Sequence, residues 1–146
     1  MDTSKINLIE RYIENNHFGK LVGMDFKIIS EGVIDYFLTI KKEHLATPNA
    51  AHGGVISTLI DGALGVAGLS SVYKENKVVS TIEYKLNFLS PALLGDQLIA
   101  KAKVEQKGKR ILIISCDVFC ANRENKLLAK SLGTFNAYDA EKAGYK

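Results

Sequence analysis

The first element that the pattern of apolar positions predicts is a short helix near the N-terminus. Residues 4–16 carry apolar side chains at mixed helical spacing, and the run ends in Asn15-Asn16-His17 with Gly19 shortly after it. Small polar residues followed by glycine are typical of a helix end. We therefore expect a helix that docks on the rest of the fold and ends near Asn15, with His17 on the surface.

Strands are predicted wherever apolar and polar positions alternate. The segments with this alternation are residues 26–30, 34–40, 81–88, 98–105, 110–121 and 127–138. Because side chains of a strand point to opposite faces in turn, the third segment should direct Ile82 and Tyr84 to one face. Thr81 and Glu83 should then point to the other face.

A long central helix is predicted over about residues 53–73. The stretch between Glu43 and Lys74 has one charged side chain, Asp61, among apolar residues and glycines. A carboxylate in such surroundings must find hydrogen-bond partners or it destabilises the fold. Asp61 is therefore the first candidate functional residue.

Asp61 falls on a narrow face of this helix that carries small or polar side chains, at positions 57, 61, 65 and 68. The other positions are apolar, as expected for a helix that is buried on most sides. Two plainer interpretations are a core helix whose Asp is satisfied by its neighbours, and a membrane span. The glycines, the hydroxyl groups and the carboxylate at the midpoint argue against the span.

The order of these elements predicts an α+β fold in which an antiparallel sheet packs on the long helix. A chain of 146 residues is expected to form one domain, residues 1–146, with residues 1–20 as an N-terminal helix and lead-in. Because the central helix is apolar nearly all round, the sheet must curve about it or a second subunit must cover it. This geometry favours a homo-oligomer.

Charge and cysteine content narrow the class of protein. The net charge of +3 is scattered, with no basic run of the kind that binds nucleic acid. The polar, amphipathic N-terminus does not read as a signal peptide, so a cytoplasmic location without membrane attachment is expected. Cys116 and Cys120 would lie on one face of a strand, about 13 Å apart and too far to bridge, which suits core thiols in a reducing compartment.

His52-Gly53-Gly54 precedes the central helix. Glycines at a helix start let a ligand approach N–H groups that have no intrahelical partner, and the helix dipole favours negative charge there. Such a turn can be an oxyanion hole or only a tight turn. Gly53 and Asp61 are separated by about 12 Å of helix rise, so one chain cannot bring both to the same carbonyl. If both act, two subunits must share each site.

These residues resemble a known family. The pattern His-Gly-Gly-x-x-x-x-x-x-Asp at positions 52–61, then Thr81-x-Glu83, Asn87-Phe88-Leu89-x-Pro91, Gly95-Asp96 and the basic turn at 107–110, resembles the hot-dog fold acyl-CoA thioesterases of the phenylacetic-acid-degradation (PaaI-like) type. The resemblance covers residues 20–138. It implies a sheet wrapped around a central helix, a homodimer or homotetramer, and hydrolysis of acyl-CoA to a free acid and CoA. No metal and no cofactor apart from the CoA of the substrate are expected.

The resemblance also implies roles for single residues. Asp61 would be the catalytic carboxylate, acting on water or as nucleophile, and the Gly53 N–H would be the oxyanion donor. His52 would contact the thioester region and Thr81 would help to place the water. The predicted substrate contacts, with the basic pair directed to the CoA phosphates, are Gly54, Asn49, Ser57, Thr58, Lys109 and Arg110.

Plainer alternatives stay open for these residues. They are a helix-start hydrogen bond for His52, hydrogen bonds within the helix for Ser57 and Thr58, and solvation for Thr81 and the basic turn. His44 is expected on the surface. The acyl pocket is expected near the helix middle and the dimer seam, lined by residues such as Leu59, Ile60, Leu64 or Phe88.

The chain departs from the family pattern at Ala46, where much of the family has an Asn that orients substrate or water, and Asn49 follows three residues later. This departure leaves a non-catalytic acyl-CoA binding or sensing module open as an alternative. A hot-dog dehydratase or hydratase built on His52 and Asp61, and a structural oligomer, are further alternatives.

Overall fold

The computed structural model describes residues 3–145, with side chains from Leu8 onward. The helices are α1 (Thr3–Asn15), α2 (His17–Val22) and α3 (Gly53–Val72), with short 3-10 turns η1 (Lys42–His44), η2 (Tyr73–Glu75) and η3 (Ala140–Ala143). The strands are β1 (Asp25–Ser30), β2 (Val33–Thr39), β3 (Lys77–Phe88), β4 (Gln97–Lys107), β5 (Ile111–Cys120) and β6 (Lys126–Asp139).

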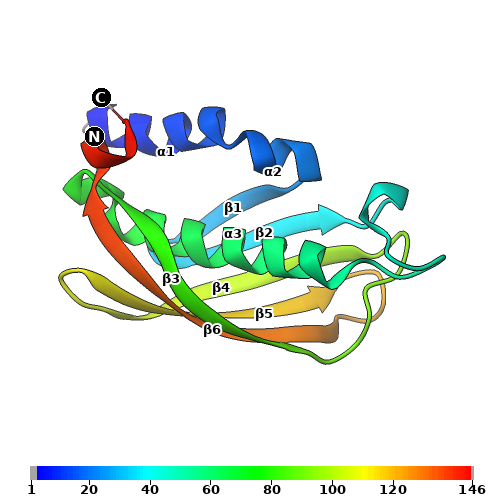
Figure 1. Cartoon of the computed structure of the whole chain (residues 1–146). Helices are drawn as coiled ribbons and strands as arrows, with labels where there is room; N and C mark the ends of the chain where they lie inside the picture. The colour runs from blue at the N-terminus through cyan, green and yellow to red at the C-terminus, as the bar shows by residue number, and fades with distance from the viewer. Residues whose placement is uncertain (1–2, 146) are drawn as a thin grey trace.

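The six strands form one antiparallel sheet in the order β1-β2-β4-β5-β6-β3, and this sheet curves around α3 (Figure 1). The predicted α+β architecture is thereby confirmed. The strands after the helix do not form a simple meander, however, because β3 pairs with β6 at the far edge while β4 returns to pair with β2 and β5. Within the described sheet, β3 is therefore an edge strand of 12 residues with one unpaired side.

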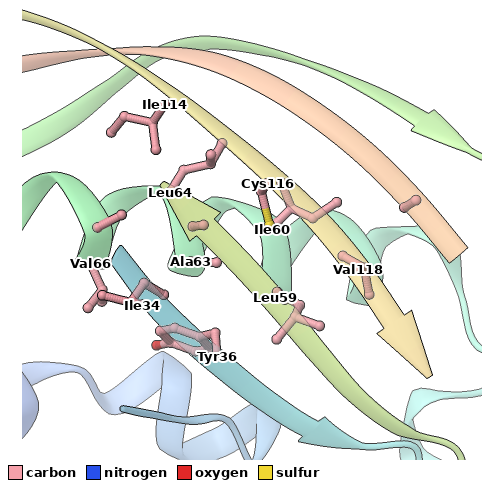
Figure 2. Close-up of a cluster of buried hydrophobic side chains, with 14 of the residues drawn as sticks. Ile34, Tyr36, Leu59, Ile60, Ala63, Leu64, Val66, Ile114, Cys116 and Val118 are labelled. Atoms are coloured by element: carbon pink, nitrogen blue, oxygen red, sulfur yellow. The ribbon is translucent and has the colours of Figure 1, made fainter. Parts of the chain in front are cut away.

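The core lies between α3 and the concave face of the sheet. Figure 2 shows Leu64 of α3 near Ile114 of β5 and Ile60 of α3 near Cys116 of β5. These four side chains and Leu59 are at most 1% exposed. The stretch Gly53–Glu75 is long and apolar enough to cross a membrane, but 67% of its most apolar window is buried inside the fold. Its apolar residues are thus explained as the core of the domain.

The two cysteines are free and buried, as predicted. Burial raises the pKa of the Cys116 thiol to about 12, so this thiol stays protonated near neutral pH. Both side chains serve as small apolar groups in the core.

The N-terminal helix ends at Asn15, close to the predicted end, but a second helix follows it at once. Asn16 caps α2 by accepting a hydrogen bond from the Gly19 N–H at 3.1 Å. Gly23 ends α2 in the left-handed conformation, with φ 92°, which favours glycine. The helix pair α1 and α2 lies over α3 on the side that the sheet leaves open (Figure 1).

The predicted alternation within β3 is wrong at one point, and the reason is a β-bulge. The pairing register with β6 shifts between Thr81 and Glu83, so Ile82 is an extra residue without an opposite partner and is 52% exposed. Because one inserted residue reverses the phase of a strand, Thr81 faces α3 on the same side as Tyr84. Glu83 instead accepts a hydrogen bond from Thr134 Oγ1.

His17 is exposed as predicted, whereas His44 is not on the surface and only 4% of it is exposed. Its Nδ1 accepts from the Lys41 N–H at 2.9 Å, and its Nε2 lies 2.8 Å from the Val22 carbonyl oxygen. A carbonyl can only accept, so Nε2 carries the proton and the ring is neutral. With both ring nitrogens satisfied, His44 ties η1 to the end of α2.

Candidate active site

Asp61 lies in the middle of α3 on the face that turns away from the sheet core. Its Oδ1 accepts a hydrogen bond from Thr81 Oγ1 at 2.7 Å, across the gap between α3 and β3. The side chain is partly exposed, and it borders a pocket. The structure thus brings together two of the four predicted catalytic residues.

The pocket has a volume of about 380 Å³ and lies between α1, α3 and β3, with the C-terminal end of the chain at its side. Asp61, Thr58 and Thr81 contribute polar groups to its wall, and Gly62 and Gly65 form its floor along α3. Its remaining wall is mainly aromatic, from Tyr12, Phe18, Tyr36, Phe135, Tyr138 and Tyr145. A cavity with few polar groups in an apolar lining is typical of a small-molecule site.

The turn at the start of α3 forms a second, separate hollow. Its lining includes Gly53, Ile56 and Phe88 but not Asp61. His52 is in extended conformation and its Nδ1 accepts from the Gly54 N–H at 2.8 Å, so His52 is the N-cap of the helix. Its role in the described protomer is therefore the helix-start hydrogen bond, which also occupies the Gly54 N–H.

Gly53 is the first residue of α3, and its N–H forms no hydrogen bond with other described residues. A free N–H at a helix start can bind an anionic oxygen. A side chain at this position would have its Cβ 3.3 Å from Phe88 Cζ, so glycine leaves the N–H accessible beside the aromatic ring. Gly53 thus presents a helix-start N–H in the hollow that does not include Asp61.

The other predicted substrate contacts are not gathered at the pocket, with the exception of Thr58. Thr58 Oγ1 donates to the Gly54 carbonyl within the helix at 2.9 Å. Ser57 Oγ lies 2.5 Å from Tyr84 Oη, so Ser57 is engaged by β3. Asn49 is exposed in the loop before α3, where its carbonyl accepts from the Leu94 N–H at 2.9 Å.

Lys109 and Arg110 are exposed in the β4–β5 turn, and neither lines the pocket. This turn lies near the end of α3 opposite to Gly53 (Figure 1). Their assignment to CoA phosphates stays a prediction.

The predicted lining of the acyl pocket is mostly wrong. Leu59, Ile60 and Leu64 are fully buried against the sheet, because the apolar face of α3 forms the core and its Gly-rich face forms the pocket. Phe88 lies in the hollow at Gly53.

Several polar pocket residues were not predicted from the sequence, among them Tyr12, Asn16 and Tyr36. Asn16 Nδ2 donates to both tyrosine hydroxyls at 3.4 Å. Burial, together with the neighbouring Tyr36, raises the pKa of Tyr12, and burial also raises the pKa of Tyr36. Both phenols therefore stay protonated and neutral. The sequence did not mark Tyr36 as a pocket residue, because a tyrosine at a buried strand position resembles any other core residue.

The chemistry of these groups is that of a carboxylate and a separate backbone donor. No cluster of three or more metal-ligating side chains occurs among the residues that the structure describes. A carboxylate can take a proton from water, and a helix-start N–H can stabilise a developing oxyanion. A carboxylate and such a donor at one site can together catalyse acyl transfer to water.

Comparison with known proteins identifies the family. The family model of the thioesterase superfamily matches residues 49–126, which include His52, Gly53, Asp61 and Thr81. A putative esterase of Archaeoglobus fulgidus is 30% identical over 134 residues, covering 89% of this chain and 83% of the relative. The acyl-coenzyme A thioesterase PaaI of Escherichia coli is 29% identical over 116 residues, covering 80% of this chain and 79% of the relative.

Among solved structures, E. coli PaaI from the phenylacetic acid degradation operon superposes with a TM-score of 0.82 at 23% identity. The match covers 92% of this chain and 93% of that chain, so the fold is shared over nearly its whole length. The chain therefore belongs to the thioesterase superfamily, as a PaaI-like thioester hydrolase with the hot-dog fold.

Proposed function

We propose that this protein hydrolyses acyl-CoA thioesters at a site shared by two subunits, with Asp61 as general base and the partner's Gly53 N–H as oxyanion donor. The observation that carries the proposal is the pairing of Asp61 with Thr81 at the wall of a pocket, while the free Gly53 N–H lies in a different hollow of the same protomer. Acyl-CoA is the substrate class in the name of the E. coli relative.

The unpaired edge of β3 supplies a seam for the proposed dimer. A long exposed edge strand presents unpaired N–H and C=O groups that another strand can pair with. On this strand Thr81 contacts Asp61, and Phe88 lies against Gly53. If two β3 strands pair antiparallel about an axis between Tyr84 and Lys85, Thr81 of one subunit stands opposite Phe88 of the other. That register brings each Asp61 towards the partner's Gly53 and generates two equivalent sites.

Much of the small-residue face of α3 is in contact with the sheet of its own protomer. Ser57 is engaged by Tyr84 of β3, Gly65 by Phe135 of β6, and Gly68 by Val79 of β3, all within one protomer. The edge of β3 is the better seam, because it lies beside both halves of the proposed site.

In the proposed reaction Asp61 takes a proton from a water molecule, and the water oxygen attacks the thioester carbonyl carbon. The carbonyl oxygen becomes an oxyanion that accepts a hydrogen bond from the partner's Gly53 N–H, a donor of the kind whose removal costs about 10²–10³ in rate. The intermediate collapses with cleavage of the C–S bond, and the proton held by Asp61 passes to the CoA sulfur. Thr81 positions the carboxylate by its hydrogen bond to Oδ1.

Subunit complementation tests this proposal. Asp61→Asn removes the base, and Gly53→Pro removes the N–H at the first helical position, where proline is well tolerated. If two subunits share each site, an equimolar remixed sample forms about half heterodimers, each with one intact site, and regains about a quarter of the wild-type activity. If one subunit holds the whole site, no mixture regains activity. Hydrolysis of acyl-CoA by neither wild type nor mixture would refute the proposed function itself.

A further inference from the structure

The pocket beside Asp61 is a trough that runs along one face of α3. Residues four apart in a helix lie on the same face, so Gly65 and Leu69 follow Asp61 in one row. All three line the pocket. A methyl group on Gly65 would lie 3.7 Å from Phe135 Cε2, so glycine keeps the floor low at this point. Leu69 is thus the first large side chain on this row beyond Asp61, about 12 Å further along the helix.

The two ends of this trough differ in exposure. Phe18 of α2 lines one end and is 59% exposed, whereas Leu69 and Val78 at the other end are 3% and 6% exposed. In Figure 1, α2 lies over the half of α3 that contains Gly53, while η3 and the start of α1 lie at the opposite end. The CoA moiety of the proposed substrate is large and charged, so it requires the open end. An acyl group held at Asp61 then extends towards Leu69.

Tyr145 covers the buried end of the trough. It follows η3 and packs against a small apolar cluster that is separate from the main core, and this cluster consists of Leu8, Leu69, Val78 and Ala140. Tyr145 and the neighbouring Tyr138 both line the pocket. The trough therefore ends in apolar and aromatic side chains, a lining that suits an uncharged aliphatic or aryl terminus.

Contacts from two elements hold Tyr145 in this position. Its N–H donates to the Ala140 carbonyl at 3.2 Å, and Gly144 before it has φ 91°, a left-handed conformation that turns the chain and favours glycine. The guanidinium carbon of Arg11 in α1 lies 5.6 Å from the centre of the Tyr145 ring, which is a cation–π arrangement. The ring is thus fixed between α1 and η3.

Resting on the proposed function, we propose that Tyr145 is a specificity-determining residue that closes the trough together with Leu69 and limits the length of the acyl chain. Chains that end before Tyr145 should gain about fourfold in kcat/KM for each methylene that the trough buries. Longer chains must displace the ring or leave apolar carbons in water. The kcat/KM value should therefore rise with chain length to an optimum and then fall.

A series of straight-chain esters from acetyl-CoA to hexadecanoyl-CoA tests the inference, and wild type should show such an optimum. Tyr145→Ala should move the optimum to longer esters and raise kcat/KM by at least about tenfold for the first ester beyond the wild-type optimum. Tyr145→Phe keeps the ring beside Arg11 and should keep the wild-type optimum. Tyr73→Ala is the matched control and should keep it too, since Tyr73 packs against the same apolar cluster without lining the pocket.

Gly65→Ala gives a change in the opposite direction. Its added methyl group would meet Phe135 at 3.7 Å, an ordinary contact distance, so the fold is retained while the trough narrows. The optimum should move to shorter esters. Wild-type rates that do not depend on chain length, an unchanged optimum in Tyr145→Ala, or an equal shift in Tyr73→Ala would overturn the inference.

Binding gives a second measurement that does not depend on turnover. By calorimetry, Asp61→Asn should bind the ester at the optimum more tightly than the longer esters, and adding Tyr145→Ala should remove the difference. Equal affinities for all chain lengths in Asp61→Asn would count against the inference even if no ester were hydrolysed. Length-dependent binding without hydrolysis by wild type would refute the proposed function and leave the role of Tyr145 intact.

Discussion

Thr81 Oγ1 donates a hydrogen bond to Asp61 Oδ1 over 2.7 Å, and a single inserted residue in β3 makes this contact possible. Without the bulge at Ile82, regular alternation would place Thr81 and Tyr84 on opposite faces of the sheet. With it, both point to α3, so β3 supplies the partner of Asp61 and the partner of Ser57 together. Bulges beside active sites commonly redirect a side chain in this way.

The first prediction concerns this hydrogen bond. Thr81→Val keeps the shape of the side chain and removes the hydroxyl, so Asp61 loses its positioning partner. Because hydrogen bonds to charged groups contribute about 1.5–3 kcal/mol, we expect kcat/KM to fall by about 10- to 100-fold. Thr81→Ser retains the hydroxyl and should stay within about threefold of wild type. Equal losses in both variants would assign the effect to packing.

The second prediction concerns Asp61 itself. Asp61→Asn should lose at least about a hundredfold in kcat, the lower range for a missing general base, while the melting temperature changes little. Asp117→Asn is a matched control, since Asp117 pairs with Lys130 in an exposed position on β5. Thiol release from a panel of acyl-CoA esters measures both variants. Comparable turnover in Asp61→Asn and wild type would remove Asp61 from the mechanism.

The fold was predictable from the sequence as far as it depends on periodicity. Alternation located the strands because one face of the sheet is buried on α3, and the long apolar run located α3 itself. The place of β3 at the far edge was not predictable, because periodicity states which face is buried and not which strand lies alongside. The bulge was not predictable either, because Ile82 is apolar and fits the expected alternation although it is 52% exposed.

The site was predictable where a residue differs in polarity or size from the residues around it in the sequence. Asp61 stood out as the one charge in an apolar helix, and glycine before that helix marked Gly53. Tyr12, Asn16 and Tyr36 could not be found in the same way, because the pocket brings them together from separate elements. The sequence alone contains no signal that these three residues lie close together in the fold.

The third prediction concerns the Gly53 N–H. Gly53→Pro deletes the proposed oxyanion donor, whereas Gly53→Ala keeps the N–H and adds a Cβ at 3.3 Å from Phe88 Cζ. His52 already has the extended conformation that a residue before proline prefers. We expect kcat to fall about 10²–10³-fold in Gly53→Pro and much less in Gly53→Ala. Circular dichroism and the melting temperature verify the fold, and similar losses in the two variants would point to a steric effect near Phe88.

The last prediction concerns the ion pair that holds the loop between β3 and β4. Arg123 Nη2 lies 2.6 Å from Asp96 Oδ2 and also donates to the Pro91 carbonyl, while Asp96 accepts from the Leu93 N–H at 2.7 Å. Burial alone would raise the pKa of Asp96, but the hydrogen bonds from Arg123 and Leu93 outweigh it and lower the pKa below 3.8. The same loop bonds the chain before Gly53, since the Ala51 N–H donates to the Ala92 carbonyl at 2.8 Å.

A carboxyl group with a lowered folded-state pKa stabilises the protein above its unfolded-state pKa, and that stabilisation is lost as pH falls through the folded-state value. The free energy of unfolding should therefore decline as pH falls below the ordinary titration range of an aspartate, about pH 4. Asp96→Asn should lower it by about 1.5–3 kcal/mol at pH 7 and flatten the acid decline. Asp117→Asn, which breaks an exposed pair, should cost less than about 1 kcal/mol and keep the decline. Urea unfolding at a fixed protein concentration measures these values, and an acid decline in Asp96→Asn as steep as in wild type would show that other carboxyl groups cause it.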